Sequence, residues 1–232
     1  MCFRTLSPMA DIISSWLRLR RRGSLTYKVA FGVAGESELL VKSDEWKNPT
    51  DWSREYLLYY NSQRDLFALP LTPLTDDPKP MRLTETPWGE AWPKVSPDGH
   101  WIAYESNQAG GQGPASVNSG PSNIYAESFP KRGFKRPVST KGGKKPRWSP
   151  NGRELYYVAP DSTLMAVATK PAGTSLEIGT PAALFQPRLA SVTNPGYGVA
   201  PDGRFLINLA TDEQTAAPIT VILNWASGLK QK

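Results

Sequence analysis

A short polar turn followed at once by an apolar run recurs along this chain of 232 residues. The clearest copy is VSPDGHWIAY at 95–104, and it recurs as WSPNGRELYYV at 148–158 and VAPDGRFLIN at 199–208. A shortened copy, WSREYLLYY at 52–60, lacks the two residues that form the Asp-Gly turn elsewhere. Apolar runs that begin directly after such turns are typical of β-strands joined by tight turns. The pattern therefore predicts an all-β fold built from repeated units.

The spacing of the copies indicates the architecture. The residues that begin the turn, Ser53, Ser96, Ser149 and Ala200, are 43, 53 and 51 residues apart. Repeats of about 40 to 50 residues with several strands each match the blades of a β-propeller. The run after each turn is almost entirely apolar, as expected for a strand covered on both faces. We predict a β-propeller with four-stranded antiparallel blades.

Further strands are predicted from the remaining apolar segments. Two precede the first repeat, at 25–31 and 38–41, and the strands after the turns have partners at 65–69, 123–127 and 163–167. We also expect a hairpin from 175–178 to 183–185, and pairing of 205–208 with 219–225. A Gly- and Ser-rich loop at 108–121 joins two strands.

The repeats divide the chain into an N-terminal segment, 1–24, which is basic and does not fit the repeat, and a partial propeller, 25–229. The propeller contains about 3.5–4 blades, at roughly 25–80, 81–135, 136–188 and 189–229. Within the N-terminal segment, 11–22 fits a basic amphipathic helix on a membrane surface, a worn strand, or the start of a truncated reading frame. Membrane contact is expected only through 16–22.

Composition narrows these readings. Twenty-two Pro and 19 Gly suit short strands and many turns, and a single cysteine, Cys2, excludes a disulfide framework or a thiolate metal site. No apolar run is long enough to span a membrane, and the N-terminus does not match a signal peptide because its arginines follow its apolar stretch. The low cysteine content is compatible with either the cytoplasm or the periplasm. The net charge of +6 is concentrated at 18–22 and 131–145.

Catalytic, cofactor and metal residues are not expected. His100 is the only histidine, so a His-dependent triad has no other candidate, and no G-x-S-x-G motif is present. Asp98 and Asp202 lie in matching turns without the further carboxylates that a calcium shell needs. Aspartates in such turns cap their own backbone. We expect a protein that is not an enzyme.

The segment 131–147 is the candidate for binding a partner. Eight of its 17 residues are basic: Lys131, Arg132, Lys135, Arg136, Lys141, Lys144, Lys145 and Arg147. Such a cluster could attract acidic partners, although a solvated connection between blades is the favoured explanation. Nucleic acid is not favoured, because the segment matches no nucleic-acid-binding motif.

Taken together, the repeats resemble those of TolB-like propellers, relatives of WD-type blades. One blade has the order typical of that family: Arg82-Leu83-Thr84, Ser96-Pro97-Asp98-Gly99, Ile102-Ala103-Tyr104, Ile124-Tyr125. Other segments resemble the C-terminal propellers of bacterial serine/threonine protein kinases: Glu38-Leu39-Leu40, Asp65–Pro70, Phe129-Pro130, Pro146-Arg147-Trp148 and Pro218–Trp225. That resemblance implies a preceding kinase domain and membrane helix, and a propeller outside the cytoplasm. The chain contains no kinase motif.

The resemblance implies a ring of six to eight blades, more than this chain supplies. We therefore interpret the chain as part of a larger propeller. A partial ring has open sheet edges, and these favour self-association of the isolated chain, which light scattering can test. The leading interpretation is a non-catalytic scaffold that binds a protein or peptide. The alternatives are a sensor or regulatory remnant of a kinase or peptidase whose catalytic domain is missing, and a decaying fragment.

Overall fold

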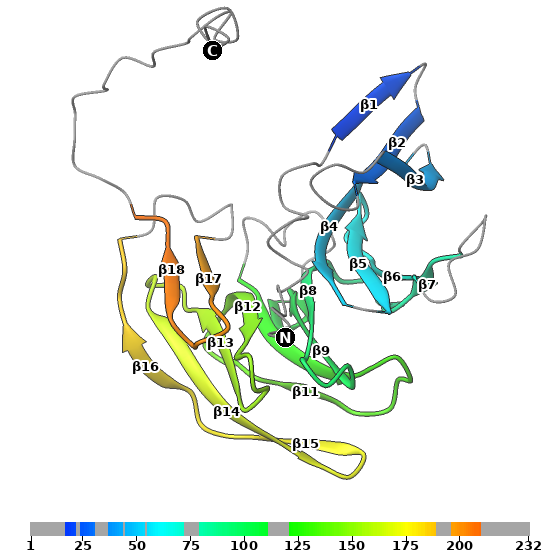
Figure 1. Ribbon diagram of the computed structural model, residues 1–232. Coiled ribbons are helices and arrows are strands. Elements are labelled where there is room, and N and C mark those ends of the chain that lie inside the picture. The colour runs from blue at the N-terminus through cyan, green and yellow to red at the C-terminus, as the bar shows by residue number, and fades with distance from the viewer. Residues whose placement is uncertain are drawn as a thin grey trace, which may run out of the picture.

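The computed structural model describes residues 17–21, 24–30, 37–43, 45–53, 55–71, 79–110, 121–188 and 196–209 (Figure 1). All strand pairs within these ranges are antiparallel. A single 3-10 turn, Gln108–Gly110, is the one helical element among them. None of the described helices is long and apolar enough to cross a membrane. The prediction of an all-β fold is confirmed.

Two sheets have four strands that follow one another in chain order. The first consists of β4 (Lys47–Trp52), β5 (Tyr56–Asn61), β6 (Leu66–Pro70) and β7 (Met81–Arg82). The second consists of β8 (Glu90–Val95), β9 (Trp101–Ser106), β10 (Asn123–Ser128) and β11 (Lys135–Pro137). Consecutive strands that pair in order form a meander, which is the topology of a propeller blade.

The third sheet departs from the prediction. It contains β12 (Lys144–Trp148), β13 (Glu154–Val158) and β14 (Leu164–Ala172), and β14 pairs with both β15 (Ser175–Ile178) and β16 (Ala182–Phe185). The hairpin expected between 175–178 and 183–185 is therefore wrong. The nine residues of β14 are long enough to take β15 along one half and β16 along the other.

Two smaller sheets lie at the ends of the described chain. The first contains β1 (Leu17–Arg21), β2 (Ser24–Ala30) and β3 (Ser37–Ser43), so the basic N-terminal segment is a strand over 17–21. The last contains β17 (Tyr197–Val199) and β18 (Phe205–Ile207). The expected partner of 205–208, at 219–225, lies outside the described residues.

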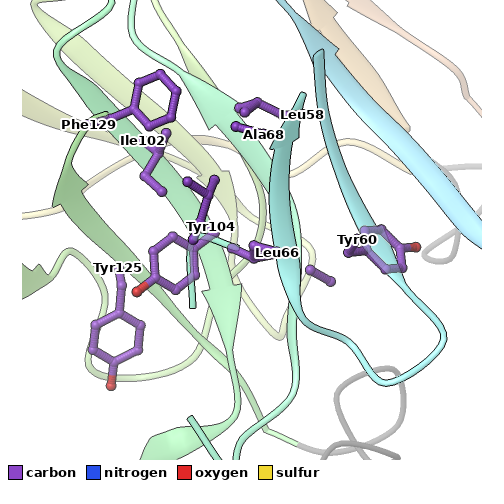
Figure 2. Packing of buried hydrophobic residues seen from close by; sticks show 10 residues of the cluster. Leu58, Tyr60, Leu66, Ala68, Ile102, Tyr104, Tyr125 and Phe129 are labelled. Atoms are coloured by element: carbon purple, nitrogen blue, oxygen red, sulfur yellow. The ribbon is translucent and has the colours of Figure 1, made fainter. Parts of the chain in front are cut away.

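Neighbouring sheets pack face to face through the apolar runs. Ile102 and Tyr104 of β9 face β5 and β6. Figure 2 shows these two side chains across a buried layer from Leu58 of β5 and from Leu66 and Ala68 of β6. Trp101 and Ala103, on the other face of β9, join a second cluster with β13, β14 and β15. Because both faces are buried, the run is apolar throughout. Burying each large side chain of this kind contributes about 1.5–3 kcal/mol.

The first strand of each larger sheet lies on the inside of the arrangement. β8 contacts both β4 and β12, and β12 also contacts β17. Each of β4, β8 and β12 contains a register shift, at Pro49/Asp51, Ala91/Lys94 and Lys144/Arg147. A bulge turns side chains away from regular alternation and lets a strand tolerate proline. We call β4, β8, β12 and β17 the inner strands.

Candidate functional site

The repeated turn is a structural device. Asp98 Oδ1 accepts a hydrogen bond from the backbone N–H of His100 at 3.1 Å, and Trp101 N donates to Ser96 Oγ at 3.0 Å. Asn151 and Asp202 cap Arg153 N and Arg204 N in the same way, at 3.0 and 3.1 Å. The prediction that these aspartates cap their own backbone is confirmed. His100 itself is exposed.

The structure separates the eight predicted basic residues into two groups. Four are exposed along β10–β11 and the connection to β12: Lys131, Arg132, Arg136 and Lys141. We call these four the outer basic edge. The other four are at least partly buried: Lys135, Lys144, Lys145 and Arg147. Neighbours in sequence thus point in different directions, because strand pairing and turns intervene.

The outer basic edge follows the last strand of its sheet. β11 has three residues, of which Arg136 and Pro137 are exposed. Arg132 Nε donates to Glu127 Oε1 at 3.0 Å, and that buried carboxylate also accepts a hydrogen bond from Tyr104 Oη at 2.8 Å. No acidic residue occurs between 128 and 143. Short, charged, proline-containing edges also protect sheets from unwanted pairing, so the edge has a structural use as well.

Lys135, between these exposed cations, is directed inward. Its ammonium donates to Gln108 Oε1 at 2.9 Å and lies 5.5 and 5.2 Å from the ring centres of Tyr104 and Tyr125. Burial is the main cause that lowers its pKa below the ordinary value. Lys135 therefore contributes to packing within its blade.

Buried charges connect the inner strands. Asp51 of β4 lies 3.3 Å from Lys94 of β8, and the two side chains are only 8% and 6% exposed. The second oxygen of Asp51 accepts a hydrogen bond from Val95 N at 2.8 Å, and Lys94 also donates to the carbonyl of Thr50. Burial lowers the pKa of Lys94 to about 8, although Asp51 opposes this shift. The pair thus links two sheets at some cost in desolvation.

A second set of bonds connects β12 to its neighbours. Trp148 Nε1 donates to the carbonyl of Lys94 at 3.1 Å, and Tyr197 Oη donates to the carbonyl of Lys145 at 2.7 Å. The backbone N–H of Lys145 donates to the buried carboxylate of Glu105 at 2.6 Å. Burial raises the pKa of Glu105 to about 7 and lowers that of Lys145 to about 8. These contacts fix the bulge of β12 from three sides.

Arg147 differs from its charged neighbours. It lies on β12 and is partly exposed, and in the described part of the chain its guanidinium has no hydrogen bond or ion pair. Its charge contributes to lowering the pKa of both Lys94 and Lys145, so Arg147 is close enough to repel each of these lysines. The inner strands therefore carry more positive charge here than Asp51 and Glu105 balance.

Glu90, at the start of β8, is a further buried acid. It is completely inaccessible, and one oxygen accepts a hydrogen bond from Thr86 Oγ1 at 2.5 Å. Burial raises its pKa to about 6. Asp51, Lys94, Glu105 and Glu90 were not singled out in the sequence. Asp51 and Lys94 have a detectable signal, because each lies two residues before the serine that begins the turn.

Comparison with known proteins identifies the fold. No family model and no curated protein matches the chain. Among solved structures, a protein assigned as TolB from Agrobacterium tumefaciens is 17% identical over 80% of this chain and 69% of that one, with a TM-score of 0.51. A protein assigned as a 6-phosphogluconolactonase from Bacteroides uniformis is 16% identical over 81% of this chain and 58% of its own, with a TM-score of 0.50.

These likenesses show that the chain folds as a partial TolB-like β-propeller with antiparallel blades, two of which have four strands. It spans 69% of the first of these two solved chains and 58% of the second. One neighbour is named after an enzyme, so the fold alone does not separate a binding module from a catalyst. The more specific resemblance to kinase-attached propellers stays a prediction.

Proposed function

We propose that this protein is a non-catalytic propeller module that binds an acidic protein or peptide segment through the outer basic edge. The observation that carries the proposal is the exposure of Lys131, Arg132, Arg136 and Lys141 on one strand connection without an intervening acid. Propellers present such connections at their surface, where partners reach them without disturbing the blades.

The electrostatics of the edge support an acidic partner. Lys131, Arg136 and Lys141 are exposed, so a partner can reach their side chains. Clustered charges of one sign raise the encounter rate with an oppositely charged partner, and salt at physiological strength screens them beyond about 8 Å. Binding through the outer basic edge should therefore weaken steeply as salt is added.

The polar groups elsewhere support the non-catalytic part of the proposal. Asp98 and Asp202 cap turns, while Asp51 and Glu105 accept hydrogen bonds from the backbone of neighbouring strands. Groups held in this way maintain the blades.

The test is charge reversal at matched positions. A fluorescent Glu-rich decapeptide serves as probe, and its anisotropy is measured with the full chain and with K131E/R136E/K141E. The control, R153E/K170E/R204E, makes the same charge change at exposed arginines and a lysine on other strands and turns. We expect the edge variant to raise Kd at least about tenfold, equivalent to about 1.4 kcal/mol, and the control to raise it less than about threefold.

Two results contradict the proposal. Equal losses in both triple variants mean that the peptide responds only to net charge. Tighter binding of a single-stranded oligonucleotide than of the peptide, with the same dependence on the edge, assigns the surface to nucleic acid.

The second candidate is the sensor or regulatory domain of a kinase or peptidase, exposed outside the cytoplasm. It is supported by the segments that resemble kinase-attached propellers, among them Asp65–Pro70, most of which forms β6. Reading the DNA upstream of the codon for Met1 in all frames tests it. A kinase pattern followed by a membrane helix supports this candidate, and unrelated sequence in every frame counts against it.

A further inference from the structure

Equivalent positions on the inner strands carry different charges. The residue two places before the turn is Asp51 on β4, Lys94 on β8, Arg147 on β12 and Gly198 on β17. Each inner strand contacts the next. From β4 to β8 an acid therefore lies beside a cation, and from β8 to β12 a cation lies beside a cation. In the third step the position equivalent to Arg147 on the next strand is Gly198, which has no side chain. The acid that balances Lys94 has no counterpart for Arg147.

Among the described residues, no side chain accepts a hydrogen bond from the Arg147 guanidinium. Tyr197 lies close enough for the arginine's charge to act on its pKa, and its hydroxyl donates to the carbonyl of Lys145. Glu105 accepts a hydrogen bond from the backbone N–H of Lys145. A guanidinium has five N–H donors, and at this partly exposed position an incoming oxyanion can reach them.

The backbone beneath this site is held in an unusual conformation. Trp92 and Lys145 occupy equivalent positions four residues before the turn, and their φ angles are 55° and 59°. Non-glycine residues in this region are uncommon, and they concentrate at functional sites where neighbouring contacts fix them. The ammonium of Lys145 lies 5.4 Å from the ring centre of Trp92, so the two bulges also contact each other.

We propose that Arg147, flanked by Lys94 and Lys145, binds the carboxylate or phosphate group of a small ligand at the inner strands of the propeller. Arginine's planar donors match both oxyanions in a two-point geometry, and the two lysines add long-range attraction. Partial burial lowers the local dielectric, which strengthens the attraction relative to a fully exposed site. This site is separate from the outer basic edge and does not depend on it.

The test uses the full chain with inorganic phosphate and with succinate as separate probes, at constant ionic strength set with chloride. Calorimetry gives Kd, and the shift in melting temperature gives an independent reading. R147Q removes the charge, R147K keeps the charge without the planar guanidinium, and R153Q is the control at an exposed arginine in the turn before β13. Far- and near-ultraviolet circular dichroism checks that each variant is folded.

We expect at least one probe to bind the unchanged protein and R153Q equally. R147Q should weaken it by about 10- to 100-fold, the range for a hydrogen bond to a charged group, and R147K by less. Binding of phosphate alone identifies a phosphate ligand, and binding of succinate alone a carboxylate ligand. If R147Q does not fold, R147K carries the comparison. The proposal is overturned if neither probe binds, or if the Arg147 variants bind as the unchanged protein does.

Discussion

Replacing Asp51 by asparagine tests whether a buried charge pair holds adjacent blades together. Asparagine has the same size and still offers an oxygen to Val95 N, so the substitution removes mainly the negative charge beside Lys94. Removing one member of a buried pair leaves the other charge without compensation and costs about 3–5 kcal/mol. We take the lower end, because Lys94 keeps its hydrogen bond to the carbonyl of Thr50. The expected loss is about 3 kcal/mol of unfolding free energy at pH 6.

The loss should depend on pH. The pKa of Lys94 in the folded protein, about 8, is below its ordinary value of 10.5, so the folded state binds this proton less tightly than the unfolded chain does. Stability therefore rises as the pH rises from 8 toward 10.5, by up to about 3 kcal/mol at about 1.4 kcal/mol for each pKa unit. Without Asp51 the pKa falls further. At pH 9 the amine is mostly neutral in the folded state of both proteins, and the loss should shrink to about 1 kcal/mol.

Urea unfolding followed by tryptophan fluorescence at pH 6 and pH 9 measures both values. D161N is the matched control, because Asp161 is exposed and caps only its own turn. D51N/K94M completes a double-mutant cycle, in which the two changes together should cost less than their sum by at least about 2 kcal/mol. The reasoning is refuted if D51N and D161N are equally stable at pH 6, or if the loss caused by D51N grows toward pH 9.

Three further variants follow from the same contacts. W148F loses a buried hydrogen bond between blades and should cost about 1–2 kcal/mol in urea unfolding, more than W101F, because the buried indole N–H of Trp101 has no partner. In E105Q, the unfolding free energy measured by calorimetry should depend less on pH. The pKa of Glu105 in the folded protein, about 7, is above the ordinary 4.5, so the unchanged protein loses about 3 kcal/mol of stability as the pH rises through this range. Glutamine does not titrate, so the variant should not show this loss. G143A should destabilise by about 1–3 kcal/mol in urea, since its Cβ would lie 2.8 Å from the nearest side-chain oxygen, and G99A by about 1 kcal/mol, since its turn is open and only its φ of 76° is strained. A smaller loss for G143A than for G99A contradicts that last expectation.

The strands that follow the turns were predictable because their burial makes them uniformly apolar. Trp101–Tyr104 and Leu155–Val158 each face a neighbouring sheet on both sides. The inner strands gave no such signal. β4, β8 and β12 each contain a proline and at least one lysine, features that argue against a central strand. Each pairs with another strand on one side only, and a bulge accommodates the irregular residues.

The candidate sites show a similar division. The basic residues of 131–147 were visible as a cluster in sequence, but which of them reach solvent depends on pairing and on the bulge of β12. Lys145 is 6% exposed, whereas Arg136, nine residues earlier, is an exposed residue. The buried pair of Asp51 and Lys94 was not predictable, because charged residues are ordinarily exposed and these two are 43 residues apart. Only the stacking of repeats brings them to 3.3 Å.

Comparing equivalent positions separates what builds a blade from what distinguishes one. The glycines of the turn at 99, 152 and 203 have φ between 67° and 84°, and the cap residues make the same backbone hydrogen bonds in each copy. Two residues before the turn begins, the side chain differs in every copy: Asp51, Lys94, Arg147 and Gly198. Because the inner strands lie next to one another, these variable positions form a short row of charges. A module that repeats its scaffold and varies one inward row can bind a specific ligand there without altering the fold. Arg147, which has no ion-pair partner among the described residues, is therefore the position to test first.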